Sequence, residues 1–100
     1  CYDFMSATLV NLSKVDMILV GDSLGMNMLG MKGTVGVTVD DMVYHIKNVV
    51  KGAPDTFVVG DMPFGSYNGN IDKAVENATR IFAEGGCDCV KMEGGMNTVT

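Results

Sequence analysis

The sequence predicts an α/β fold made of parallel βα units. Short, almost wholly apolar runs alternate with longer stretches in which apolar residues recur at helical spacing. The predicted order is helix, strand, helix, strand, helix, strand, and this alternation is typical of a parallel sheet with helices packed against it. With 100 residues, 47% of them hydrophobic, the chain is expected to form a single segment, residues 1–100, rather than several domains.

The first helix and the first strand are expected within the first 20 residues. Asp3 has a side chain suited to a helix N-cap, and the helix is expected to continue to about Leu12. Residues 17–20 form a continuous apolar run, as expected of a strand that is covered on both faces. The residues spaced to form one apolar face of the helix are Phe4, Ala7 and Val10.

The second helix begins with a pattern that resembles a capping box. Thr38 stands three residues before Asp41, which takes the place of the usual Glu or Gln, and Gly52 and Pro54 end the helix. The next strand is expected at residues 57–60. The apolar stripe of this helix consists of Met42, Ile46, Val49 and Val50.

A third helix and a third strand complete the pattern. Asn70 is the expected N-cap, Gly85 and Gly86 are the expected end, and a strand is expected at residues 89–92. The apolar positions of this helix are Ala74, Ala78, Ile81 and Phe82. Methionines at core-type positions along the chain are Met17, Met42 and Met92.

Charge and cysteine content narrow the classes of function. Seven basic and 12 acidic residues give a net charge of −5, which argues against a nucleic-acid partner because phosphate binding needs a basic surface. No apolar run approaches the roughly 20 residues that span a bilayer, and no signal peptide is recognisable. The three cysteines are an odd number, so we expect reduced thiols and a cytoplasmic protein. Half of a metal site is the alternative interpretation of Cys87 and Cys89, although no second cluster completes it.

Acidic residues follow all three predicted strands. Asp22, Asp61 and Glu93 are expected at the carboxyl ends of the strands, where parallel folds bind their ligands. Carboxylates brought together repel one another, and a hard divalent cation relieves the repulsion; oxygen ligands favour magnesium over zinc. Lys91 lies two residues before Glu93 on the same strand face, where its charge could stabilise a substrate carboxylate or a developing enolate.

Each of these residues also has a structural interpretation. A single Asp at a strand end is usually a helix N-cap or a turn residue, and Lys91 could serve only in a salt bridge. His45 falls within the second helix, where a surface or packing role is favoured over catalysis. Residues 24–30 form a glycine-punctuated loop that could be a lid or a subunit contact. Tyr2 could line the same edge or simply pack.

Several ordered motifs together closely resemble the ketopantoate hydroxymethyltransferase family. The resemblance extends from Tyr2 to Gly95 and implies the family's (β/α)8 TIM barrel, of the type found in phosphoenolpyruvate- and pyruvate-binding enzymes. The chain would then be the N-terminal part of the barrel, in a homo-oligomer that is commonly a decamer. The motifs are VGDSLGM at 20–26, TV at 38–39, YH at 44–45, KGAP at 51–54, DMPF at 61–64 and VKMEGG at 90–95.

The resemblance implies a reaction and a set of site residues. 5,10-Methylenetetrahydrofolate would donate a hydroxymethyl group to 3-methyl-2-oxobutanoate, giving 2-dehydropantoate for pantothenate synthesis through a magnesium-assisted enolate. Asp22 and Asp61 would bind magnesium, and Glu93 would complete its environment. The general base, a glutamate, is expected beyond Thr100. The residues implied to bind the oxo acid are Asp22, Ser23, Asp61 and Lys91.

Two other functions remain as alternatives. A carbon–carbon lyase of the phosphoenolpyruvate mutase or isocitrate lyase type would share the barrel and a magnesium-bound oxo acid, but the segments at 23–25 and 62–64 argue against it. A non-catalytic half-barrel that binds an oxo acid or a protein partner is the alternative from another class. The 100-residue segment alone would leave strand edges unpaired, so neither independent folding nor turnover is expected of it.

Overall fold

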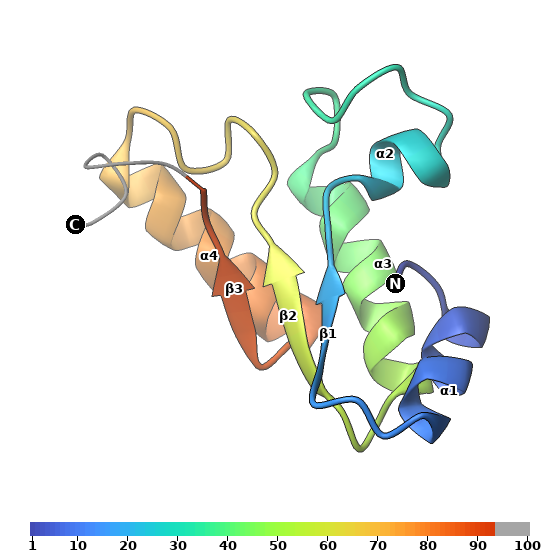
Figure 1. The fold of residues 1–100 in the computed structure, drawn as a ribbon. Helices are drawn as coiled ribbons and strands as arrows, with labels where there is room; N and C mark the ends of the chain where they lie inside the picture. The colour runs from blue at the N-terminus through green and yellow to red at the C-terminus, as the bar shows by residue number, and fades with distance from the viewer. Residues whose placement is uncertain (94–100) are drawn as a thin grey trace.

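A computed structural model describes residues 1–93, which contain a parallel three-stranded sheet (Figure 1). The strands are β1 (Met17–Val20), β2 (Phe57–Asp61) and β3 (Cys89–Lys91), in the order β1-β2-β3. Val20 lies opposite Gly60, and Asp61 lies opposite Lys91. The α/β class and the three parallel strands predicted from the sequence are confirmed, with the third strand ending one residue earlier than expected.

The three predicted helices are present with the predicted caps. They are α1 (Phe4–Leu12), α3 (Val39–Gly52) and α4 (Ile71–Gly85). The Asp3 carboxylate accepts from the Ser6 amide at 2.7 Å, and Thr38 and Asp41 exchange side-chain-to-amide bonds of 3.0 Å in a complete capping box. The Asn70 side chain caps α4, which ends at Gly86 in the left-handed conformation, φ 82°.

A fourth helix, α2 (Leu24–Asn27), lies in the segment interpreted as a loop. Its single turn is too short to produce a recognisable apolar period, which explains why the sequence did not predict it. Leu24 and Gly25 are buried, so the segment packs into the body of the protein rather than lying over it. None of the helices within residues 1–93 is long and apolar enough to cross a membrane.

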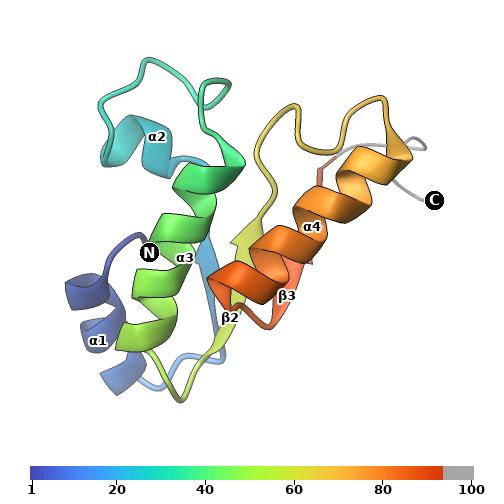
Figure 2. The same cartoon turned by 180° about the vertical axis from the view of Figure 1, so that it is seen from behind.

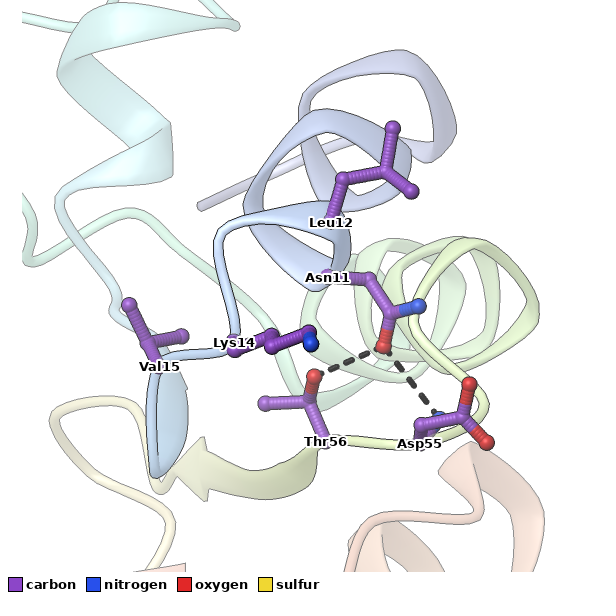
Figure 3. A pocket seen from close by; sticks show the side chains of 6 residues that line it. All are labelled: Asn11, Leu12, Lys14, Val15, Asp55 and Thr56. Carbon is purple, nitrogen blue, oxygen red and sulfur yellow. Dashed lines mark hydrogen bonds between the residues drawn. The ribbon is translucent and has the colours of Figure 1, made fainter.

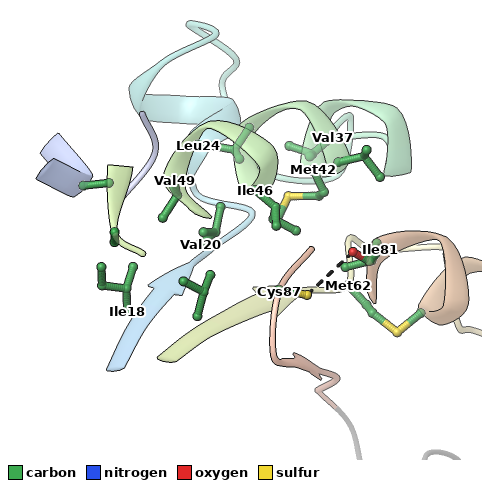
Figure 4. Close-up of a cluster of buried hydrophobic side chains, with 14 residues drawn as sticks. Ile18, Val20, Leu24, Val37, Met42, Ile46, Val49, Met62, Ile81 and Cys87 are labelled. Atoms are coloured by element: carbon green, nitrogen blue, oxygen red, sulfur yellow. Dashed lines mark hydrogen bonds between the residues drawn. The ribbon is translucent and has the colours of Figure 1, made fainter. Parts of the chain in front are cut away.

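The helices form a layer on one face of the sheet. Figure 2 shows α3 and α4 in front of the strands, with α1 packed against α3. The core fills the space between sheet and helices and is drawn in Figure 4. An ion pair between Arg80 on α4 and Asp40 on α3, at 2.7 Å, links the two helices at their surface. The largest fully buried side chains are Leu24, Met42, Ile46, Ile81, Val20, Val49, Val58 and Pro63.

The other face of the sheet is uncovered within the described residues. Met17 and Leu19 of β1 are 59% and 43% exposed, and Phe57 of β2 is also exposed. The prediction that residues 17–20 are covered on both faces is therefore wrong for this part of the chain, because its helices all lie on one side. Met17 and Met92, expected at core-type positions, and Phe4 and Phe82, expected on apolar helix faces, are 42–59% exposed, so these expectations are wrong for the described part of the chain.

Substitution of Gly52 by alanine is expected to lower the free energy of unfolding by about 1–3 kcal/mol. A Cβ atom at Gly52 would lie 2.6 Å from the Phe4 carbonyl oxygen and 2.8 Å from the Ala7 Cβ, so α1 would have to move away from α3. Thermal or urea unfolding of the whole protein measures the loss. Gly33→Ala is the matched control, because a Cβ there meets nothing within 4 Å. Equal stability of the two variants would contradict the packing of α1 on α3.

Candidate active site

The acidic residues predicted to share one edge of the sheet lie there. Asp22 follows the end of β1, Asp61 is the last residue of β2, and Glu93 follows β3 by two residues. In Figure 1 the carboxyl ends of the three strands point to the same end of the sheet. Parallel pairing produces this arrangement, because every strand delivers its last residues to one edge.

Asp61 is the most buried charged side chain of the edge, at 4% exposed. Its Oδ2 accepts from the Asp22 amide at 3.1 Å, and its Oδ1 lies 3.9 Å from Lys91 Nζ. Burial raises the pKa of Asp61 above its ordinary value, although the Asp22 amide and the Lys91 charge act in the opposite direction. The negative charges of Asp22 and Glu93 raise this pKa further. A positive charge brought to this edge would therefore stabilise the ionised carboxylate.

Lys91 connects the carboxylates of β2 and β3. Its Nζ donates to Glu93 Oε1 at 2.6 Å, and this hydrogen bond raises the pKa of Lys91 and lowers the pKa of Glu93. Both groups are therefore charged at neutral pH. Lys91 thus forms the salt bridge that its structural interpretation suggested, with Glu93. Its ammonium also lies near Asp61, at the edge of the sheet where the site was predicted.

Ser23, which was also predicted to bind the substrate, follows Asp22 at the end of β1. Its Oγ lies 2.7 Å from the Tyr2 hydroxyl, so Tyr2 reaches the edge as one of the two interpretations suggested. Asn27 of α2, which was not predicted, donates to the same Tyr2 hydroxyl at 3.0 Å. His45 is buried on α3 with its Nδ1 2.8 Å from the Tyr2 carbonyl oxygen, which confirms a packing role rather than a place among the carboxylates.

The glycines at the strand ends differ in their surroundings. A Cβ atom at Gly21 would face Ser23 Oγ at 3.4 Å and Asp61 Oδ2 at 3.9 Å, so this backbone borders the site closely. A Cβ atom at Gly60 would instead meet Ile46, Ile81 and Cys87. Gly60 is thus a packing glycine between β2 and the helices rather than a point where a ligand approaches the backbone. Gly94 and Gly95 lie outside the described residues.

The donor chemistry of the edge fits magnesium. Asp61 offers a buried carboxylate that contacts the backbone of Asp22, and oxygen-only ligands suit a hard cation. Within residues 1–93, no three Asp, Glu, His or Cys side chains form a group that could hold an ion, and Glu93 is hydrogen-bonded to Lys91. The site of three carboxylates therefore stays a prediction, as does a metal role for Cys87 and Cys89.

A pocket of about 380 Å³ lies at the opposite end of the strands (Figure 3). The segments that line it precede β1 and β2, so it is remote from the carboxylates. The Asn11 side-chain oxygen accepts from the Asp55 amide at 3.3 Å and from Thr56 Oγ1 at 2.7 Å. These bonds join the end of α1 to the segment before β2 and give the pocket a structural role. Its lining residues are Asn11, Leu12, Lys14, Val15, Asp55 and Thr56.

Comparison with known proteins identifies the relatives of this chain. A family model described as ketopantoate hydroxymethyltransferase matches residues 1–100. Proteins named 3-methyl-2-oxobutanoate hydroxymethyltransferase are similar to it in Listeria monocytogenes serotype 4a, 54% identical over 98% of this chain, and in Heliobacterium modesticaldum, 55% identical over 94%. A protein of the same name in Geobacillus thermodenitrificans is 55% identical over 98% of the chain. The matches cover 34–35% of these relatives, so the chain spans about a third of their length.

Substitution of Asp61 by asparagine is expected to raise the free energy of unfolding at neutral pH when metal is chelated. Because the pKa of Asp61 in the folded protein lies above 3.8, the folded state keeps a proton that the unfolded state has already released. The free energy of unfolding therefore falls as pH rises from 3.8 through the folded pKa, and it stays lowered at neutral pH. Asparagine keeps an oxygen for the Asp22 amide and carries no charge.

Thermal unfolding of the whole protein, followed from neutral pH downward, measures this effect. The Asn variant should be more stable than the wild type at neutral pH and should lack this part of the pH dependence. Asp55→Asn is the matched control, because Asp55 is exposed before the opposite end of the same strand. An Asp61→Asn protein that is less stable than the wild type at neutral pH would show that burial of this charge is not costly.

Proposed function

Because the chain belongs to the ketopantoate hydroxymethyltransferase family, we propose that the whole protein transfers a hydroxymethyl group to 3-methyl-2-oxobutanoate. The donor is 5,10-methylenetetrahydrofolate, and the product is 2-dehydropantoate, a precursor of pantothenate. Three relatives carry the name of the acceptor. The observation that carries the proposal is the buried carboxylate of Asp61, held beside Asp22 and Lys91 in a chain that the family model matches from end to end.

Asp22 and Asp61 are the proposed magnesium ligands, and Glu93 is proposed to complete the environment of the ion. The two aspartates already lie side by side, and the raised pKa of Asp61 reflects a charge that lacks compensation. When bound, magnesium supplies Lewis-acid chemistry, polarising the keto group of the oxo acid so that its C3 proton becomes more acidic.

Ser23 and Lys91 are proposed to hold the anionic substrate. The Lys91 ammonium lies at the carboxylate edge, where it would balance the negative charge of the oxo acid and the charge that develops as C3 loses its proton. The Ser23 hydroxyl would donate to the substrate carboxylate. A glutamate beyond this chain is the proposed acceptor of the C3 proton, in the part of the protein that the relatives have and this segment does not cover.

We further propose that the sheet is part of a (β/α)8 barrel. In such a barrel the helices surround the strands and the opposite strand faces fill the interior. The one-sided helix layer of this chain supports the proposal, because Met17, Leu19 and Phe57 would then be buried by the remaining strands. A cytoplasmic homo-oligomer is the proposed form of the whole protein.

The experiment is an assay of the whole protein with 3-methyl-2-oxobutanoate, methylenetetrahydrofolate and magnesium. Formation of 2-dehydropantoate that stops when a chelator removes the metal is the expected result. Cleavage of isocitrate-type substrates without hydroxymethyl transfer would identify a carbon–carbon lyase instead. Binding of the oxo acid without any turnover would favour a non-catalytic binding protein.

Asp22→Asn and Asp61→Asn are each expected to lower the magnesium-dependent activity about 100-fold or more, because each removes a charged ligand of the ion. Initial rates measured across a range of magnesium concentrations test this expectation. Asp55→Asn, at the other end of β2, should keep the wild-type rate. Wild-type rates in both site variants would contradict the ligand assignment.

A further inference from the structure

A chain of hydrogen bonds runs from Asn27 through Tyr2 to Ser23 at the carboxyl edge. We propose that Tyr2 and Asn27 are positioning residues that turn the Ser23 hydroxyl proton toward the substrate carboxylate. This inference rests on the proposed function, because it deepens the role of Ser23 in binding an anionic oxo acid. Its three hydrogen bonds join residues of the N-terminal segment, the end of β1 and α2.

The backbone fixes the orientation of the Asn27 amide. Its Nδ2 lies 3.2 Å from the Ser23 carbonyl oxygen and 3.0 Å from the Tyr2 hydroxyl. A carbonyl oxygen can only accept, so the side-chain atom of Asn27 that faces it must be the NH₂ group and not the oxygen. The same nitrogen therefore donates its second proton to the Tyr2 hydroxyl, which acts as an acceptor.

The direction of the next bond depends on the single proton of the phenol. Within residues 1–93, the Tyr2 hydroxyl has two hydrogen-bonding partners. Asn27 donates to it, and Ser23 Oγ, at 2.7 Å, is the one partner that can accept its proton. Either hydroxyl can supply the proton of this bond, and the direction we propose, from Tyr2 to Ser23, gives the phenol proton an acceptor within the described residues. The Ser23 hydroxyl, which makes no capping bond to α2, keeps its own proton for a group outside the chain.

Tyr2 is held at its backbone as well as at its hydroxyl. The buried His45 ring on α3 lies 2.8 Å from the Tyr2 carbonyl oxygen, and α3 packs against both α1 and β1. Tyr2 is thus fixed at two points, its backbone carbonyl and its hydroxyl. A hydrogen-bond chain in which every member donates in the same direction strengthens the last donor, because each bond polarises the next.

The direction of the chain also sets the kind of ligand that Ser23 recognises. A hydroxyl restricted to donating favours an acceptor, and a carboxylate is the strongest acceptor that a 2-oxo acid offers. Asp22 and Asp61 make the surroundings of Ser23 negative, which disfavours binding of an anion. A polarised Ser23 hydroxyl would offset part of this cost. Tyr2 and Asn27 are therefore expected to contribute to affinity for the oxo acid and not to affinity for the folate donor.

The test is a double-mutant cycle on the whole protein, with KM and kcat measured separately for the oxo acid and for methylenetetrahydrofolate. Tyr2→Phe should raise KM for the oxo acid about 3- to 10-fold, with kcat and the folate KM little changed. In a Ser23→Ala background, Tyr2→Phe should cause no further rise. Tyr44→Phe removes the same hydroxyl from an exposed ring of α3 and should match the wild type.

Asn27→Asp tests the direction of the chain. A carboxylate at this position accepts from Tyr2, so Tyr2 would have to accept from Ser23, and the serine proton would turn away from the substrate. The oxo-acid KM should rise about tenfold or more. In a Ser23→Ala background, Asn27→Asp still adds a negative charge but has no serine proton to redirect. The KM for the oxo acid should therefore rise less than it does when Ser23 is present.

The outcomes separate this inference from the proposed function. Wild-type protein that neither binds the oxo acid in calorimetry nor converts it would overturn the proposed function, and the positioning role with it. If the wild type converts the oxo acid but Tyr2→Phe has an unchanged KM, or raises it equally with and without Ser23, only the positioning role is overturned. Thermal unfolding midpoints within about 2 °C of the wild type would show that each variant is folded.

Discussion

The burial of one carboxylate, that of Asp61, is the constraint on which the candidate site depends. Parallel pairing places this residue at the end of the middle strand, beside the Asp22 amide on one side and Lys91 on the other. Removing a carboxylate from water is costly, and one amide and one distant ammonium compensate only part of the cost. The edge therefore carries an excess of negative charge that a hard cation would balance, and this excess supports the proposed magnesium site.

The rest of the architecture holds that edge in place. The helices on one face of the sheet fix β1 and β2 through a continuous core, while α1 and α3 hold the N-terminal segment so that Tyr2 reaches Ser23. The candidate site residues at the strand ends are positioned by rigid elements, whereas the hydrogen bonds to Ser23 come from Tyr2 and the short helix α2. The other face of the sheet is open within the described residues, and the chain spans about a third of the length of its relatives.

Features determined by local chemistry were predictable from the sequence. Caps such as Asp3 and Asn70 depend on hydrogen bonds over three residues, and the strands depend on short apolar runs, so both could be read along the chain. The common edge of the acidic residues followed from parallel topology alone. Exposure of Met17 and Leu19 could not be predicted, because burial depends on which segments cover a face. The link from Asn27 to Tyr2 joins residues 25 positions apart and leaves no periodic signal.

Titration with Mn²⁺, a paramagnetic substitute for Mg²⁺, followed by electron paramagnetic resonance of the whole protein is the most direct measurement of the central claim. The account predicts one ion bound per chain in the wild type and in Asp55→Asn, a spectrum that changes when 3-methyl-2-oxobutanoate is added, and strongly weakened binding in Asp61→Asn. Equal binding of the ion by the wild type and Asp61→Asn, or a wild type that binds no ion, would contradict the claim that this buried carboxylate holds the metal.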